Sequence, residues 1–121
     1  MATFTITIDV KEDGQSLPNF PVTKTVTTTE SGGKATISRP DSASFTELPL
    51  GDLDGISVLY VESSEAYALR FEDQTDAGLP MSANGVCLLV NSNISSGATN
   101  KAALQTNTGS ASTVQVVAAG S

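Results

Sequence analysis

Hydrophobic and polar residues alternate from the start of the chain. In segment 3–10 (TFTITIDV), one side of an extended strand carries Phe4, Ile6, Ile8 and Val10, and the other side carries threonine and aspartate. A period of two is typical of a β-strand that is buried on one face only. The segment therefore predicts a half-buried strand.

A hairpin is expected after this first strand. Segment 11–20 (KEDGQSLPNF) is rich in turn-forming residues, and a Thr-rich strand follows from about 21 to 30. Ser-Gly-Gly at 31–33 then provides the conformational freedom of a tight turn. Together with a short strand at 34–38, these residues predict a hairpin that pairs 21–30 with 34–38.

The rest of the chain consists of short apolar runs separated by turn signals. No period is sustained over 41–55, which predicts a long loop with one short strand at most. Residues 56–62 (ISVLYVE) are apolar on both faces and are the best candidate for a central strand. Further strands are expected at 66–72, at 86–91 (VCLLVN, another buried run), at 101–106 and at 113–119.

These segments predict an all-β fold class. About eight short strands, separated by turn signals and without a helix, are typical of a β-sandwich. We expect a single-domain β-sandwich over residues 1–121, of the jelly-roll or a related Greek-key type. A closed barrel is the alternative.

Charged residues are distributed unevenly. The formal net charge is −7, and all thirteen acidic residues lie at or before Asp76. From Ala77 to Ser121 the only charged residue is Lys101. At the usual abundance, a stretch of that length carries about eleven charged residues. The C-terminal segment is therefore polar through Ser, Thr, Asn and Gln, and almost free of charge.

This neutral segment predicts a protein–protein interface. Uncharged polar groups can be desolvated against a partner without leaving a charge unpaired, and interface centres are depleted of charge. A neutral surface that faces solvent is the alternative. The residues expected to line the interface are Asn91, Asn93, Gln105, Asn107 and Gln115.

Charge and hydropathy argue against nucleic acid and membranes as partners. Six scattered Lys and Arg residues give no basic stripe for phosphates, and an acidic chain is repelled by anionic lipid surfaces. No apolar run approaches the roughly 20 residues of a membrane-spanning helix. The N-terminal residues lack the basic flank and continuous apolar core of a signal peptide. We expect synthesis and retention in a cytosol, where a single cysteine stays reduced.

The composition also argues against an enzyme. The absence of histidine removes the commonest general base and every Ser-His or Cys-His nucleophile. Cys87 lies in an apolar run, where free cysteine usually behaves as a small buried hydrophobe. The acidic turns 51–55 (GDLDG) and 72–78 (EDQTDAG) do not match the EF-hand spacing of a calcium loop, so a structural ion there is only an alternative. We assign no catalytic residue, metal ligand or cofactor.

Three segments carry a resemblance to a known class of proteins. They are 59–73 (LYVESSEAYALRFED), 79–93 (LPMSANGVCLLVNSN) and 113–120 (TVQVVAAG). The pattern resembles small bacteriophage virion proteins, in particular head decoration (cement) proteins with a β-sandwich fold. The match covers roughly the C-terminal half and includes no catalytic signature.

The resemblance implies a structural role in the virion. A decoration protein of this kind, often a homotrimer, sits on the assembled shell and clamps neighbouring major capsid subunits. Many weak contacts made at once supply its affinity. A phage tail or head–tail component is an alternative from the same class. A carbohydrate-binding module is an alternative from another class, in which Tyr60, Tyr67 or a phenylalanine would stack on a sugar.

Overall fold

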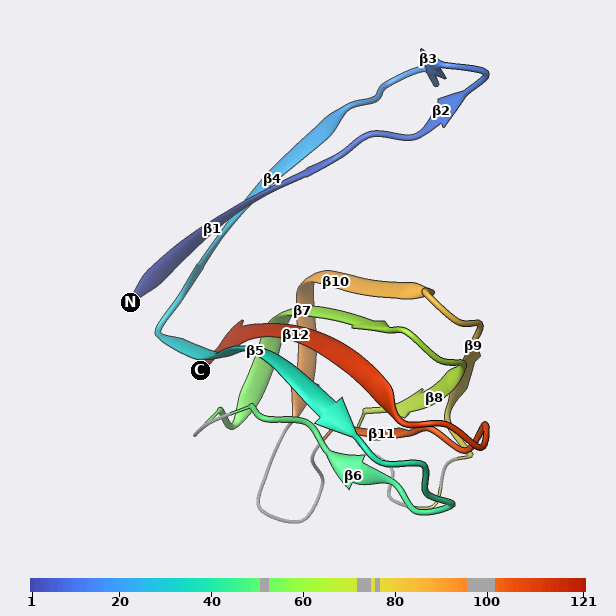
Figure 1. Cartoon of the computed structure of the whole chain (residues 1–121). Coiled ribbons are helices and arrows are strands. Elements are labelled where there is room, and N and C mark those ends of the chain that lie inside the picture. The colour runs from blue at the N-terminus through green and yellow to red at the C-terminus, as the bar shows by residue number, and fades with distance from the viewer. Residues whose placement is uncertain (51–52, 72–74, 76, 96–101) are drawn as a thin grey trace.

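The chain has two parts, a projecting hairpin and a sandwich of two four-stranded sheets (Figure 1). The computed structural model describes residues 1–50, 53–71, 75, 77–95 and 102–121, with residues 31–33 described by their backbone alone. Every regular element in these described ranges is a β-strand. The predicted all-β class is therefore confirmed.

The projecting hairpin, here called the arm, comprises residues 1–28. Its strands β1 (Ala2–Ile8) and β4 (Val22–Thr28) pair antiparallel and rise away from the sandwich (Figure 1). Phe4 lies opposite Val26, and Ile8 lies opposite Val22. The alternation of the first strand therefore continues across the ribbon, with apolar residues on one face of both strands.

A tight turn closes the tip of the arm. Two short strands, β2 (Lys11–Glu12) and β3 (Gln15–Ser16), pair there around Asp13 and Gly14. The φ angles of Asp13 and Gly14 are 51° and 81°. Positive φ at both central positions is typical of a type I′ turn, whose twist suits a two-residue hairpin, and Asp-Gly is a preferred sequence for it.

The sandwich packs two sheets face to face. The long sheet has the strand order β10-β7-β12-β5, and the short sheet has the order β6-β11-β8-β9, with all pairs antiparallel. The strands are β5 (Glu30–Arg39), β6 (Thr46–Glu47), β7 (Gly55–Ser63), β8 (Tyr67–Arg70), β9 (Leu79–Met81), β10 (Val86–Ser95), β11 (Ala103–Gln105) and β12 (Ser112–Gly120).

The core lies between these two sheets. Leu59 of β7, Leu69 of β8, Leu104 of β11 and Val116 of β12 are at most 2% exposed. Burial of each such side chain contributes about 1.5–3 kcal/mol. The Tyr67 hydroxyl, at the edge of this cluster, donates a hydrogen bond of 2.7 Å to the carbonyl of Gly85. Apolar packing therefore holds the two sheets together, and the hydroxyl of the buried Tyr67 has a hydrogen-bond acceptor.

Several strand predictions are confirmed. The segment 56–62 is the core of β7, which lies between β10 and β12 in the long sheet. The segment 113–119 lies in β12, and the expected short strand within 41–55 is β6. The described residues form twelve strands, more than the roughly eight expected, and two of the expected strands, 3–10 and 21–30, form the arm and not the sandwich. The prediction of a β-sandwich is confirmed.

The predicted hairpin between 21–30 and 34–38 is wrong. Residues 31–33 do not turn the chain but continue the backbone of β5, and β4 and β5 pair with different strands. The reason is the competition for partners: β4 completes an apolar face with β1, and β5 gains nine paired positions along β12. Long-range pairing overrides the local turn preference of Gly-Gly.

The description of 86–91 as a buried run is also wrong in part. β10 belongs to one of two packed sheets, so only one of its faces packs on the core. Cys87 points inward and is 8% exposed, whereas Val86 and Leu88 are 46% and 36% exposed. Apolar side chains on the outer face of this strand are the first sign of a surface without a cover.

Candidate protein interface

The two faces of the arm differ in chemistry. One face carries only threonine on its paired positions, and two cross-strand hydroxyl contacts, Thr3–Thr27 at 3.4 Å and Thr7–Thr23 at 3.2 Å, lie on it. The opposite face, the apolar face of the arm, carries one cation. It consists of Ala2, Phe4, Ile6 and Ile8 from β1 and of Val22, Lys24, Val26 and Thr28 from β4.

The base of the arm packs on the outer face of the long sheet. Phe4, Ile6 and Val26 form a small cluster with three residues of the sheet. Those residues are Val58 of β7, Val90 of β10 and Ala119 of β12, which lie opposite one another in the strand register. Farther from the sandwich the apolar face is less covered: Ile8 and Val22 are half-exposed, and Lys24 is exposed.

The outer face of the long sheet continues beyond this covered row. The next row of paired residues has an apolar character, and its members are half-buried or exposed: Leu88, Tyr60, Val117 and Lys34. The far row combines an exposed apolar residue with polar ones: Val86, Glu62, Gln115 and Thr36. These two rows are the exposed rows of the outer face.

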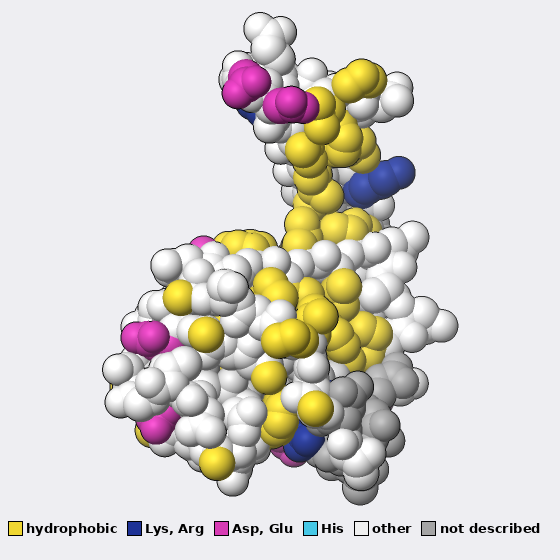
Figure 2. Space-filling view, turned by 90° about the vertical axis from the view of Figure 1, so that its right-hand side faces the viewer, with side chains coloured by type: hydrophobic (Ala, Val, Ile, Leu, Met, Phe, Trp, Pro, Cys, Tyr) yellow, Lys and Arg dark blue, Asp and Glu magenta, His cyan; other side chains and the backbone are white. Residues whose placement is uncertain are grey.

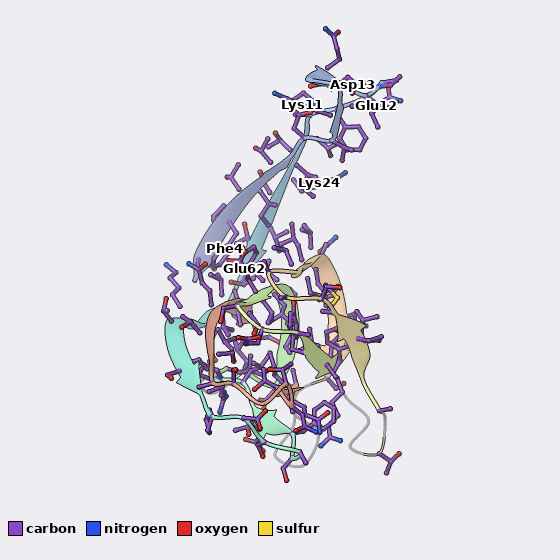
Figure 3. All side chains as sticks on the ribbon, turned by 45° about the vertical axis from the view of Figure 1, so that its right-hand side comes forward. Phe4, Lys11, Glu12, Asp13, Lys24 and Glu62 are labelled. Atoms are coloured by element: carbon purple, nitrogen blue, oxygen red, sulfur yellow. The ribbon has the colours of Figure 1, made fainter. Side chains whose placement is uncertain are left out.

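The arm and the exposed rows lie on either side of the covered row, and both carry apolar residues. In Figure 2, hydrophobic side chains run down the arm and continue onto the sandwich below it. Figure 3 shows Lys24 on the arm, beyond its junction with the sandwich, and Glu62 on the sandwich. The apolar face of the arm therefore carries one cation, Lys24, and the exposed rows carry one cation, Lys34, and one anion, Glu62.

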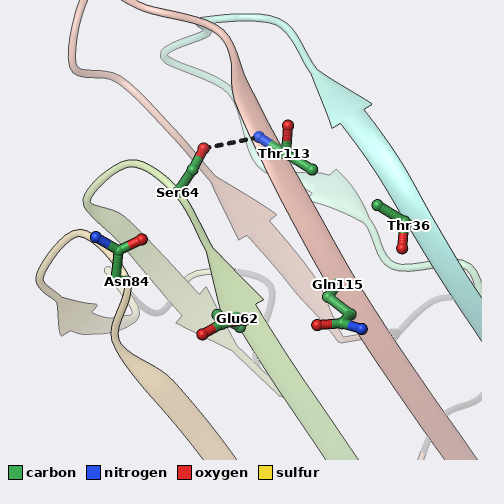
Figure 4. Close-up of a pocket in the computed structure, with 6 residues that line it drawn as sticks. All are labelled: Thr36, Glu62, Ser64, Asn84, Thr113 and Gln115. Carbon is green, nitrogen blue, oxygen red and sulfur yellow. Dashed lines mark hydrogen bonds between the residues drawn. The ribbon is translucent and has the colours of Figure 1, made fainter.

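A shallow cleft of about 360 Å³ lies around Glu62 (Figure 4). Glu62 is the only charged residue among its described lining residues, and the Ser64 hydroxyl there accepts a hydrogen bond of 2.9 Å from the backbone N–H of Thr113. Partial burial, and then the Glu62 carboxylate, raise the pKa of the neighbouring Tyr60 phenol. The lining residues are Thr36, Glu62, Ser64, Asn84, Thr113 and Gln115.

The five predicted interface residues fall in three places. Asn91, at a β-bulge with φ 61°, and Asn93 are both exposed on β10. Gln105 and Asn107 line a second shallow pocket near the short sheet, and the Gln105 amide donates to the carbonyl of Ala43. Gln115 lies in the far row of the outer face. The structure does not bring the five together, and their role at an interface stays a prediction.

Part of the neutral C-terminal segment is internal to this chain. β12 is a central strand, and Val114, Val116, Ala118 and Ala119 on it are fully buried. Buried positions exclude unpaired charge for that reason alone. Only its outward residues, such as Gln115, remain free to meet another molecule.

Sequence reasoning did not single out the arm's apolar face or the exposed rows of the sheet. The signal for the arm was present, because both of its strands alternate threonine with apolar residues. The signal for the sheet was weaker, since Tyr60, Glu62 and Leu88 lie in runs that are also typical of a buried strand.

The possible metal ligands and the cysteine of the described residues are dispersed or buried. Within them, no three His, Cys, Asp or Glu side chains gather into a metal-binding group. Burial raises the pKa of the Cys87 thiol, which opposes formation of a thiolate nucleophile. Of the acidic turns, residues 51–52, 72–74 and 76 lie outside the described part of the chain. No helix in the described part is long and apolar enough to cross a membrane.

No protein family, curated protein or solved structure matches this chain. The arm and the exposed rows of the long sheet present apolar side chains that a partner could bury.

Proposed function

We propose that this chain is a bacteriophage virion structural protein, a decoration (cement) protein that binds the assembled shell. Its partners are the major capsid protein and copies of itself in a homotrimer, and its location is the virion. It acts by many protein–protein contacts made at once and not by catalysis.

The observation that carries this proposal is the arm. A two-stranded ribbon is marginally stable in water on its own, and Ile8 and Val22 of the apolar face remain half-exposed beyond its contact with the sandwich. Exposed apolar surface of this kind is typical of protein interaction sites. The resemblance of segments 59–73 and 79–93 to head decoration proteins supports the choice of partner, and a β-sandwich is the fold that this resemblance implies.

Binding to particles tests the proposal. Purified chain is mixed with purified particles of the phage whose genome encodes it, and the chain that sediments with them is quantified. Gln115→Glu adds a second carboxylate beside Glu62 on the outer face, so we expect occupancy to fall about tenfold. Gln105→Glu is a poorer probe because Gln105 also bonds to Ala43 within the chain.

The matched control is Thr46→Glu. Thr46 is exposed on β6, in the other sheet, and we expect its substitution to leave occupancy unchanged. Absence of the chain from purified particles contradicts the proposal. A copy number far below that of the capsid protein favours a tail or head–tail component instead.

One observation favours the carbohydrate-binding alternative. Tyr60 is half-exposed beside the cleft around Glu62, whereas Tyr67 is buried and unavailable to a sugar. Binding of the isolated chain to a glycan array, lost in Tyr60→Ala, would favour this alternative over a shell protein.

A further inference from the structure

We infer that the apolar face of the arm docks on the exposed rows of the outer face of a second copy of this chain, with Lys24 of one copy beside Glu62 of the other. The inference deepens the proposed function and rests on it in taking copies of the chain as partners. It names the two surfaces that meet.

The contact within one chain shows that these surfaces fit each other. Phe4, Ile6 and Val26 of the arm already pack on Val58, Val90 and Ala119 of the outer face. Above this junction the arm leaves the sheet, so Ile8 and Val22 remain half-exposed on the arm and Leu88 remains 36% exposed on the sheet. A second arm on the exposed rows would extend a packing that the fold already uses.

Charge and position favour Lys24 as the cation that enters the cleft. An ammonium group has three donors and no acceptor, and the cleft offers a carboxylate together with amide and hydroxyl oxygens. Lys24 is on the apolar face of the arm and has no carboxylate within ion-pair distance in the described structure. By contrast, Lys11 lies 3.8 Å from Asp9, and Arg70 stacks on the ring of Phe45 at 4.0 Å.

Charge also favours a copy of this chain in this orientation. Two copies with a net charge of −7 each repel one another in most orientations. The apolar face of the arm and the exposed rows carry three charges, Lys24, Lys34 and Glu62, so Lys24 can meet Glu62 while the other desolvated residues are mostly uncharged. Because the contact joins two different surfaces, a rotation of 120° between successive copies would close it into the ring of a homotrimer.

Sedimentation equilibrium of the purified full chain, without particles, tests the inference. We expect the wild type to assemble and Ile8→Asp to weaken assembly about a hundredfold, because it buries a charge among apolar side chains. Thr7→Asp is the matched control, since it places the same charge one residue away on the threonine face. It should change assembly by less than about threefold.

A charge exchange tests the pairing itself. Lys24→Glu and Glu62→Lys should each weaken assembly about tenfold, and the double variant should recover most of that loss. Both side chains are accessible, so the variants keep the fold, which the far-ultraviolet circular dichroism spectrum checks. No recovery in the double variant, or equal effects of Ile8→Asp and Thr7→Asp, overturns the inference.

The failure of this inference and that of the proposed function are distinguishable. A wild-type chain that stays monomeric at every soluble concentration but sediments with particles overturns the contact between copies and leaves the shell role standing. A chain that assembles through the arm but is absent from particles supports the contact and contradicts the shell role.

Discussion

The arm and the sandwich are built from the same alternation of apolar and polar residues, yet their apolar side chains are buried to different extents. In the sandwich, Leu59 and Val61 are fully buried by packing between two sheets. In the arm, the best-buried apolar residue, Val26, is 8% exposed and lies at the junction with the sandwich. The same pattern thus makes a core where a second sheet covers it and a half-exposed apolar face where none does.

The largest effect on stability is expected when one apolar residue in each part is truncated. Leu59→Ala should lower the free energy of unfolding by about 3 kcal/mol, because it leaves a cavity between the sheets. Ile8→Ala should lower it by less than about 1 kcal/mol, since its side chain is half in water already. Urea denaturation at low protein concentration measures both. Equal losses would mean that the arm belongs to the same cooperative core.

A smaller effect is expected at the buried phenol of the sandwich. Tyr67→Phe removes the hydrogen bond to Gly85 and should cost about 1 kcal/mol at neutral pH. Burial, with smaller effects of Cys87, Glu62 and Tyr60, raises the pKa of Tyr67 from 10.0 to about 12. A raised pKa favours the neutral phenol in the fold.

The raised pKa of Tyr67 predicts how the stability of the fold depends on pH. The stability due to its neutral form is fully present below pH 10 and is lost as the pH rises through about 12. The difference in unfolding free energy between wild type and Tyr67→Phe should therefore shrink over this window. A difference that stays constant up to pH 12 would contradict a buried phenol at this site.

Local patterns predicted most of the strands but not their partners. The apolar run 56–62 and the alternation at 3–10 depend on side chains within one segment, and both formed strands. The partner of β5 is β12, more than seventy positions along the chain, and no local signal specifies it. This is why Gly32-Gly33 was assigned to a turn although it lies within a strand.

The candidate interface was less predictable for a related reason. Extending the tip register, in which Glu12 lies opposite Gln15, along the hairpin would place Ile8 opposite Asn19. The chain instead loops outward between the tip and β4, so Ile8 lies opposite Val22, and Ile6 lies opposite Lys24. The face that carries Lys24 among apolar residues therefore depends on a register that the sequence pattern does not fix.

The smallest expected effect compares two glycines under the same backbone constraint. Gly14 at the tip of the arm and Gly109 in a loop of the sandwich have φ of 81° and 92°, and a Cβ at either meets no atom within 4 Å. Alanine in this left-handed region costs about 1 kcal/mol at both sites.

Gly109→Ala should lower global stability by that amount, because its loop precedes the central strand β12. Gly14→Ala should leave global stability unchanged and speed amide hydrogen exchange in β1 and β4 only, because the arm touches the sandwich at its base alone. Faster exchange in β7 of Gly14→Ala would instead show that tip and core open as one unit.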